Sequence, residues 1–357
     1  MLPPGGLIQL TPKGLYCPAA GAWIDPWRPV PRALITHAHA DHAHPGSGEY
    51  WAVASSEGVL RQRLGQGIAL QDVPYGQELQ IGEATVSFHS AGHVLGSAQV
   101  RISAGDETWL ISGDYKRDPD PSCEPFQSVP ADVLITEATF GLPVYRWRPG
   151  QEVAAEIAAW WKAAPERTSI LFCYAFGKAQ RLLAELRQLG LADEVLLHGA
   201  VQTLMAPYRQ QGIAMLPTRP VSELPRSEPL AGRLVLAPPS AHRSVWMKRF
   251  KSPQTGFVSG WMAVRGARRR HGYERGFVLS DHADWDGLLA TVRQSQAQQV
   301  YVTHGQGDVL ARYLREVEGI SADPLAGGFA AELAGEGEFS DDGETAGAGI
   351  DGPVGLV

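Results

Sequence analysis

Residues 36–42 of this 357-residue chain bring four potential metal ligands into six consecutive positions. The segment reads Thr-His-Ala-His-Ala-Asp-His, and its candidate ligands are His37, His39, Asp41 and His42. Imidazole nitrogens suit zinc, manganese or iron, and a carboxylate helps to neutralise the cation. The alanines between them allow a tight turn that directs the ligands to one point. A run of histidines on a solvated loop is the alternative, but the spacing and the aspartate favour a metal site.

Three further candidate ligands stand alone later in the chain. His93 lies in Ser-Ala-Gly-His-Val-Leu-Gly-Ser, Asp114 follows Ser-Gly, and His304 lies in Val-Thr-His-Gly-Gln. Each comes after a short apolar run of strand length. Taken singly, such residues are more often structural than catalytic. Together with the first cluster, they predict a metal centre assembled at several strand ends.

The elements that must position these residues alternate between strands and helices. Short apolar runs predict buried strands at 32–36, 84–88, 108–112, 131–136, 169–174 and 299–303. Helical spacing of apolar residues predicts helices at 152–161, 178–189 and 285–294. The four prolines from Pro217 to Pro229 predict an irregular connection. This alternation predicts a layered α/β fold whose site lies on loops at strand ends.

The order HxHxDH, Gly-His, Gly-Asp and a late histidine resembles the metallo-β-lactamase fold, an αββα sandwich with a dinuclear metal site. The resemblance implies that one metal is held by His37, His39 and His93. It implies that a second metal is held by Asp41, His42 and His304. Asp114 would bridge the two, and Asp25 matches a supporting aspartate on an early strand. By ligand type the cofactors would be two divalent ions, zinc at the histidine-rich site and zinc or manganese at the other.

A second, more specific resemblance is to the β-CASP nucleases. Residues 136–139 (Thr-Glu-Ala-Thr) are similar to motif A of that family, 280–284 (Ser-Asp-His-Ala-Asp) to motif B, and His304-Gly305 to motif C. Ala138 departs from the usual serine. More than a hundred residues separate motifs A and B, where the family inserts a cap domain. The resemblance implies a metallo-β-lactamase domain in two parts, 1–145 and 276–320, and a cap over 146–275. The composition of residues 321–357 predicts an acidic tail.

Within that family the chain resembles the bacterial ligase-associated DNA exonucleases, which residues 236–243 (Leu-Ala-Pro-Pro-Ser-Ala-His-Arg) fit. This resemblance implies a metal-dependent phosphodiesterase that degrades single-stranded DNA from its end in the 5′→3′ direction. It also implies a role in DNA repair beside a DNA ligase and a helicase. Asp41 and Asp114 would act catalytically through the metals. His282 is the candidate general acid, and Glu137 would orient it and favour its protonated form.

Basic side chains concentrate in the inserted region. Residues 226–275 contain eleven Lys or Arg and only two acids, a one-signed field that is uncommon without an anionic partner but could also be a solubilising surface. The candidate nucleic-acid contacts are Arg243, Arg265, Arg268 and His242. Trp246 and Tyr273 could stack on bases or belong to the core. Lys178 follows Gly177 at a predicted helix start, which could cradle a phosphate or face solvent.

The same chemistry leaves other functions open. The first alternative is an RNA nuclease of the β-CASP type. A small-ester or thioester hydrolase on this scaffold would need neither Glu137 and His282 nor the cationic insert. A non-catalytic binder of DNA ends would keep the fold without needing all seven ligand positions, which are filled here. Assays on DNA and RNA strands and metal analysis separate these possibilities.

The net charge of -7 argues at first against a polyanionic partner. Residues 316–357, however, hold ten acids and no base, which leaves 28 acidic and 31 basic residues in 1–315. This composition predicts a disordered acidic tail on a mildly basic protein. Three cysteines without a CxxC pair, an N-terminus unlike a signal peptide and no apolar run of about 18 residues indicate a cytoplasmic protein with no membrane partner.

Overall fold

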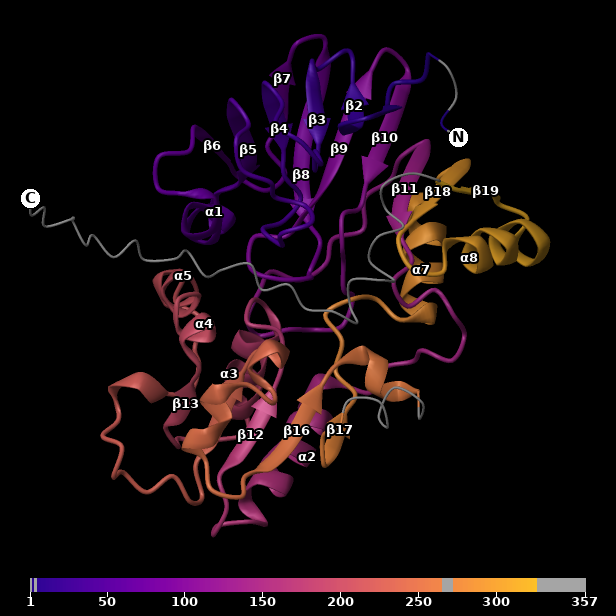
Figure 1. The fold of residues 1–357 in the computed structure, drawn as a ribbon. Coiled ribbons are helices and arrows are strands. Elements are labelled where there is room, and N and C mark those ends of the chain that lie inside the picture. Colours follow the sequence, from indigo (N-terminus) through magenta and orange to yellow (C-terminus); the bar gives the residue numbers. More distant parts are fainter. Residues whose placement is uncertain (1, 3–4, 265–271, 326–357) are drawn as a thin grey trace, which may run out of the picture.

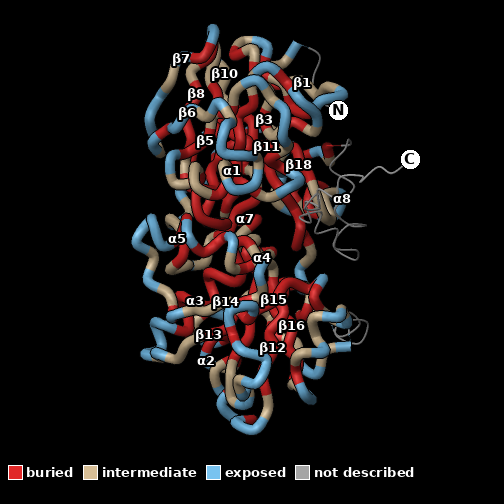
Figure 2. The backbone as a smooth tube through the Cα atoms, turned by 60° about the vertical axis from the view of Figure 1, so that its left-hand side comes forward, coloured by how far each residue is buried: buried red, intermediate tan, exposed pale blue. Residues whose placement is uncertain are grey.

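The computed structural model describes residue 2 and residues 5–264 and 272–325, which form two lobes (Figure 1). The upper lobe in this view contains the first and last parts of the described chain, and the lower lobe contains its middle part. Buried backbone runs through the centre of each lobe, whereas exposed loops cover their outer ends (Figure 2). The chain thus leaves the upper lobe once, builds the lower one and returns.

The upper lobe contains two sheets. In spatial order the first consists of β1 (Gln9–Thr11), β2 (Gly14–Cys17), β3 (Ala22–Ile24), β4 (Arg32–Leu34), β5 (Glu49–Val53) and β6 (Leu70–Val73). The second consists of β19 (Ser321–Pro324), β18 (Gln299–Thr303), β11 (Val133–Glu137), β10 (Glu107–Ile111), β9 (Ala98–Ala104), β8 (Ala84–Ser90) and β7 (Leu79–Ile81).

One apolar core lies between these two sheets, where Ile24 and Leu34 of the first pack with Phe88 and Trp109 of the second. The helices of this lobe are α1 (Glu57–Leu64), α7 (Trp285–Ser295) and α8 (Gly307–Tyr313). Helix α1 packs on the outer face of the first sheet, and α7 and α8 pack on the outer face of the second. The order helix, sheet, sheet, helix confirms the predicted αββα sandwich.

The lower lobe is built on a third sheet in which all strands run parallel. In spatial order its strands are β14 (Thr218–Pro220), β13 (Val195–Leu197), β15 (Leu234–Ala237), β12 (Ser169–Phe172), β16 (Gln254–Val258) and β17 (Arg275–Phe277). Its helices are α2 (Gly150–Lys162), α3 (Lys178–Gln188), α4 (Gly199–Gln202) and α5 (Met205–Gln210). Both faces are covered by apolar clusters, which explains why β12 and β15 are buried throughout.

The structure differs from the sequence-based expectation at three places, which concern one additional strand and the limits of two domains. Thr218–Pro220, within the proline-rich connection, forms the edge strand β14, a position where a residue without an N–H is tolerated. Strand β17 pairs with β16, so the lower sheet continues to Phe277. Strand β19 extends the sandwich to Pro324, beyond the residue at which the sequence places the start of the tail.

Candidate ligands or motif residues lie on the loops that follow β4, β8, β10, β11 and β18, and motif B lies on the loop between β17 and α7. Strands β10, β11 and β18 are parallel, and β8 runs in the direction of β10 because both are antiparallel to β9. Their carboxyl ends therefore meet at one edge of the sandwich. The loop after β12 of the lower lobe reaches this edge, since the Phe176 carbonyl oxygen lies 3.5 Å from His39 Nε2.

Candidate metal centre

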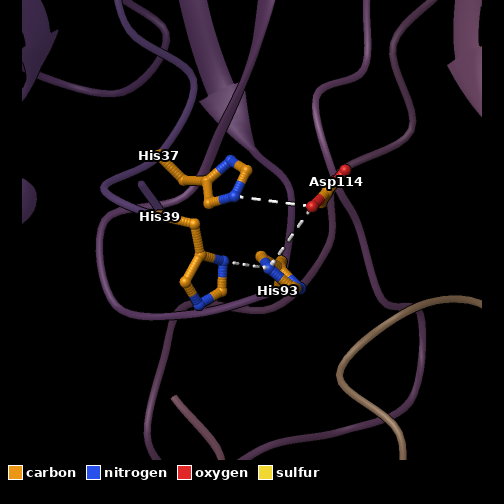
Figure 3. A group of neighbouring side chains, drawn as sticks. All are labelled: His37, His39, His93 and Asp114. Atoms are coloured by element: carbon orange, nitrogen blue, oxygen red, sulfur yellow. Dashed lines mark hydrogen bonds and ion pairs between the residues drawn. The ribbon is translucent and has the colours of Figure 1, made fainter. Parts of the chain in front are cut away.

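Three histidines and one aspartate converge at this edge (Figure 3). His37 and His39 come from the loop after β4, His93 from the loop after β8 and Asp114 from the loop after β10. One nitrogen or oxygen of each lies within 4.8 Å of the others. His93 Nε2 is 3.1 Å from His39 Nδ1, and Asp114 Oδ2 is 3.5 Å from His37 Nε2. Such a set of nitrogens and one carboxylate can hold a divalent ion.

The state of these side chains fits a cation. His37 Nε2 and Asp114 Oδ1 are buried and have no hydrogen-bond partner among the described residues, although buried polar atoms are normally satisfied. Burial lowers the pKa of His37 and His93 well below its usual value. Burial also lowers the pKa of His39 to about 4. The three rings are therefore neutral at physiological pH, as imidazole ligands must be.

The residues implied for a second metal lie beside this group. Asp41, His42 and His304 line one small cavity. His42 Nε2 lies 3.6 Å from Asp41 Oδ2 and 3.5 Å from Asp114 Oδ2, and the rings of His42 and His304 are 5.6 Å apart. Asp114 thus faces both groups, as a bridging ligand must. This second group is the more open one, because the Asp41 side chain is 48% exposed.

Asp25, the residue that directly follows β3, fixes the ligand loop by hydrogen bonds. Its carboxylate accepts hydrogen bonds from the Thr36 amide at 2.8 Å and the Thr36 hydroxyl at 2.6 Å. It also lies 2.8 Å from His42 Nδ1, and the Thr36 hydroxyl lies 3.0 Å from His37 Nδ1. Partners at Nδ1 leave Nε2 of both rings directed to the centre. Gly113 (φ 55°) makes this approach possible, since a Cβ there would lie 2.7 Å from the Thr36 side chain.

His42 and Asp114 carry opposite pKa shifts. Burial opposes the charge of His42, but the neighbouring carboxylates, led by Asp114 and Asp41, raise its pKa well above the usual value. Burial opposes the charge of Asp114 as well, yet His42 lowers the pKa of that carboxyl well below its usual range. The two side chains thus form a buried ion pair. A cation that binds through His42 must displace its proton, which makes metal affinity fall as the pH falls.

His282 and Glu137 form a second functional unit at the same edge. His282 Nδ1 lies 3.1 and 3.0 Å from the two Glu137 carboxylate oxygens. The carboxylate is buried and also accepts hydrogen bonds from the Tyr115 and Thr139 amides. The His282 ring lies 4.7 Å from that of His93, so this pair borders the candidate ligands. Glu137, His282 and Asp114 also offer ligand atoms within 4.8 Å of one another.

The candidate nucleic-acid contacts are distributed unevenly. Arg243 is exposed and half-buried His242 lies against Tyr273, with ring centroids 4.2 Å apart, beyond the carboxyl end of β15. Arg265 and Arg268 lie outside the described residues. The Lys178 ammonium is buried and lies 2.8 Å from Asp281 Oδ2. Helix α3 therefore directs this cation into the protein, whereas the sequence left open either a phosphate cradle or a solvent-facing helix start.

Sequence reasoning missed a set of buried charges around Lys178. We name it the interlobe charge cluster, and it comprises Lys116, Asp120, Lys178, Arg181, Glu185 and Asp281, all nearly inaccessible. Three cations and three carboxylates are present. Helix α3 of the lower lobe supplies Lys178, Arg181 and Glu185. Their spacing of three and four residues on one helix face was a detectable signal, because it places charges side by side along the helix.

Comparisons with known proteins connect these features to a family. No family model matches the chain. It is 34% identical over 307 residues to a probable DNA ligase of Opitutus terrae, covering 85% of this chain and 30% of that protein. It is 28% identical over 149 residues to a ribonuclease of Thermus thermophilus, covering 33% of each chain. A solved structure of an Enterococcus faecalis protein of unknown function shares the fold, with a TM-score of 0.56, 11% identity and coverage of 83% of this chain and 79% of that chain.

The αββα sandwich, the ligand cluster at its edge and the inserted parallel-sheet lobe define a metallo-β-lactamase-fold protein with a β-CASP cap. Together with the sequence matches, they show that the chain belongs to the β-CASP nuclease family. It spans about a third of the length of the two curated relatives compared above. Among the described residues, no helix has the length and apolar character needed to cross a membrane.

Proposed function

We propose that this protein is a metal-dependent phosphodiesterase that degrades single-stranded DNA from its end in the 5′→3′ direction. The observation that carries the proposal is the convergence of His37, His39, His93 and Asp114 beside the paired His282 and Glu137. Two buried ligand atoms of this group, His37 Nε2 and Asp114 Oδ1, have no hydrogen-bond partner in the described part of the chain. Hydrolysis of a phosphodiester needs a water nucleophile, stabilisation of negative charge and a proton for the leaving oxygen. This site has candidates for all three.

Two divalent cations held by the ligands named above would supply Lewis acidity to the phosphate and activate a water. The side chains do the rest. Asp114 lies between the two ligand groups and would set their separation. Glu137 is held by backbone amides and faces His282 Nδ1, so it favours the protonated ring. His282 Nε2 is then the nitrogen that would give a proton to the leaving oxygen.

DNA is the substrate we favour over RNA. The relative with the longest alignment reported above is named a probable DNA ligase, and the part similar to this chain occupies 30% of it. Joining a strand-degrading unit to a ligase would place both on damaged DNA, which supports a role in repair beside a ligase and a helicase. RNA is the second candidate, because the Thermus thermophilus relative is named a ribonuclease. The basic residues of the cap suit either polyanion.

The test is degradation of end-labelled strands by the purified protein with Zn²⁺ or Mn²⁺ added. A 5′ label on single-stranded DNA should appear at once in the smallest products, whereas a 3′ label should pass through progressively shorter strands. A matched duplex should be cut more slowly. Asp114→Asn protein, prepared in the same way, controls for contaminating nucleases. Degradation of matched RNA with DNA left intact would replace DNA by RNA in the proposal, and inactivity on both strands with metal bound would reject it.

A further inference from the structure

The interlobe charge cluster joins helix α3 of the cap to the segment that contains motif B. Lys178 Nζ lies 2.8 Å from Asp281 Oδ2, and the Arg181 guanidinium lies 3.6 Å from Asp281 Oδ1. Arg181 also donates a hydrogen bond of 2.6 Å to the Ser280 carbonyl oxygen. The Lys178 and Asp281 side chains are only 3% and 7% exposed. Solvent therefore screens these contacts little. Side chains of the cap thus hold the backbone of Ser280 and the side chain of Asp281.

Asp281 connects this cluster to the candidate metal centre on two sides. Its backbone carbonyl oxygen lies 2.7 Å from His93 Nδ1, which must donate the hydrogen bond. That bond selects the His93 tautomer whose Nε2 is free to bind a metal, the common arrangement around metal-bound histidines. The residue after Asp281 is His282, the candidate general acid. Any shift of Asp281 thus moves a ligand partner and the neighbouring proton donor together.

The start of helix α3 is fitted closely to the same place. Gly177 (φ 87°) packs against Val94, and a Cβ at this position would lie 2.4 Å from Val94 Cγ1. Val94 directly follows the candidate ligand His93. Gln180 caps the helix, because its side-chain oxygen accepts a 2.8 Å hydrogen bond from the Gly177 amide. The cations of α3 are therefore carried by a helix whose first residues already contact the ligand loop.

We propose that Lys178 and Arg181 are positioning residues, through which the cap holds Asp281 and thereby sets His93 and His282 for catalysis. The cap then sets the geometry of the reacting groups in addition to binding the substrate. The inference deepens the proposed function, on which its catalytic readout rests. A positioning role of Lys178 can be told apart from a substrate-binding role by the substrates that each would affect. A phosphate contact would matter only for a long strand, whereas a positioning role matters for every substrate.

The test compares Lys178→Met and Lys178→Arg with wild-type protein on two substrates, a labelled oligodeoxynucleotide and the small diester bis(p-nitrophenyl) phosphate. Lys162→Met is the matched control, because Lys162 forms an exposed salt bridge with Asp193 in the same lobe. We expect Lys178→Met to lower kcat by the same factor on both substrates, about 10–100-fold as for other partners of metal ligands, with KM for the strand unchanged. Lys178→Arg should restore most of the turnover. The control should match wild type.

A second readout is independent of activity. The visible absorption spectrum of Co²⁺-loaded protein reports the geometry around the ion, and it should change in Lys178→Met but not in Lys162→Met. If Lys178→Met does not fold, the double variant Lys178→Met/Asp281→Asn removes both charges of the pair and should show the same altered spectrum. A raised KM for the strand with unchanged turnover of the small diester would overturn the proposal. If wild-type protein cleaves neither substrate, the proposed function fails, and the Co²⁺ spectrum alone decides this inference.

Discussion

The candidate metal centre and the interlobe charge cluster are neighbouring sets of buried polar side chains. They differ in whether their polar atoms find partners within the protein. In the metal centre, His37 Nε2 and Asp114 Oδ1 find no hydrogen-bond partner among the described residues. In the cluster, three cations face three carboxylates. Even Asp281 Oδ1, which accepts no hydrogen bond from any residue that the structure describes, lies 3.6 Å from Arg181. The metal centre therefore has ligand atoms without partners among the described residues, whereas each charge of the cluster faces an opposite charge of the protein.

This difference indicates that the metal centre binds an outside group, whereas the cluster holds parts of the protein in place. Buried polar atoms without partners are costly, so a protein keeps them where an outside group completes them. A balanced buried cluster gains nothing from an outside ion, but it fixes the elements that carry its members. Lys116 and Asp120 come from the sandwich, whereas Lys178 and Arg181 come from the cap. The cluster is therefore a joint between lobes, and the metal centre is a site for ions.

We expect the largest effect when Asp114 loses its charge, because its carboxylate faces both ligand groups. Asp114→Asn protein should lose turnover to the background level and lose bound metal after dialysis, because the substitution removes the charge that faces both groups. Metal content measured by atomic emission alongside strand degradation checks this. Full metal content in Asp114→Asn protein would show that the ions are held elsewhere, and the contrast between the two regions would fail.

His282 lies at the border between the two regions, and its replacement decides to which it belongs. His282→Ala should lower turnover by about 100- to 10,000-fold, the range for a lost general acid, while metal content stays at the wild-type level. Turnover and metal content of the same preparation are the measurements. Phe140, whose ring lies 6.0 Å from that of His282, supplies a conservative control as Phe140→Leu. Loss of metal from His282→Ala protein would instead make His282 a ligand.

The interlobe charge cluster should show its role in stability rather than in metal content. Arg181→Met leaves Asp120 and Asp281 with fewer partners, and breaking a buried ion pair in this way typically costs about 3–5 kcal/mol. Urea unfolding with chelator present measures this loss without any contribution from metal. Lys162→Met, at an exposed pair, should change stability by less than about 1 kcal/mol. Equal effects of the two substitutions would mean that burial adds nothing to the cluster.

The fold and the metal ligands could be predicted because their signals are local. The ligands at 37, 39, 41 and 42 lie on one loop, and the apolar runs before them have the length of buried strands. These runs predict a layered fold, since the apolar faces of buried strands must be covered by other elements. Strand β19 was read as part of the tail because its only fully buried side chain is Ala322, which gives no apolar pattern.

The role of Lys178 could not be predicted, because its partner is distant in sequence. A glycine followed by a cation at a helix start looks the same whether the cation meets a phosphate or a carboxylate. Asp281 lies in motif B, about a hundred residues after Lys178, and the two side chains meet only in the folded protein. The helix spacing of Lys178 and Arg181 marks a charged face, but only tertiary packing shows that this face is buried.

The smallest effect we predict is on the pH dependence of stability, and it distinguishes the two regions once more. Burial alone would raise the pKa of Asp120, but Lys116 and Arg181 lower it below its usual value. A carboxyl with a lowered pKa stabilises the fold above its unfolded pKa of about 4 and loses this contribution as the pH falls through the folded value. In chelator, Asp120→Asn should therefore lose stability less steeply than wild type between about pH 5 and pH 3. Urea unfolding across this range measures the slope, with exposed Asp193→Asn as the control that should follow wild type. Parallel slopes for wild type and Asp120→Asn would mean that the cluster does not hold this carboxylate in its charged form, and the joint between the lobes would then rest on packing alone.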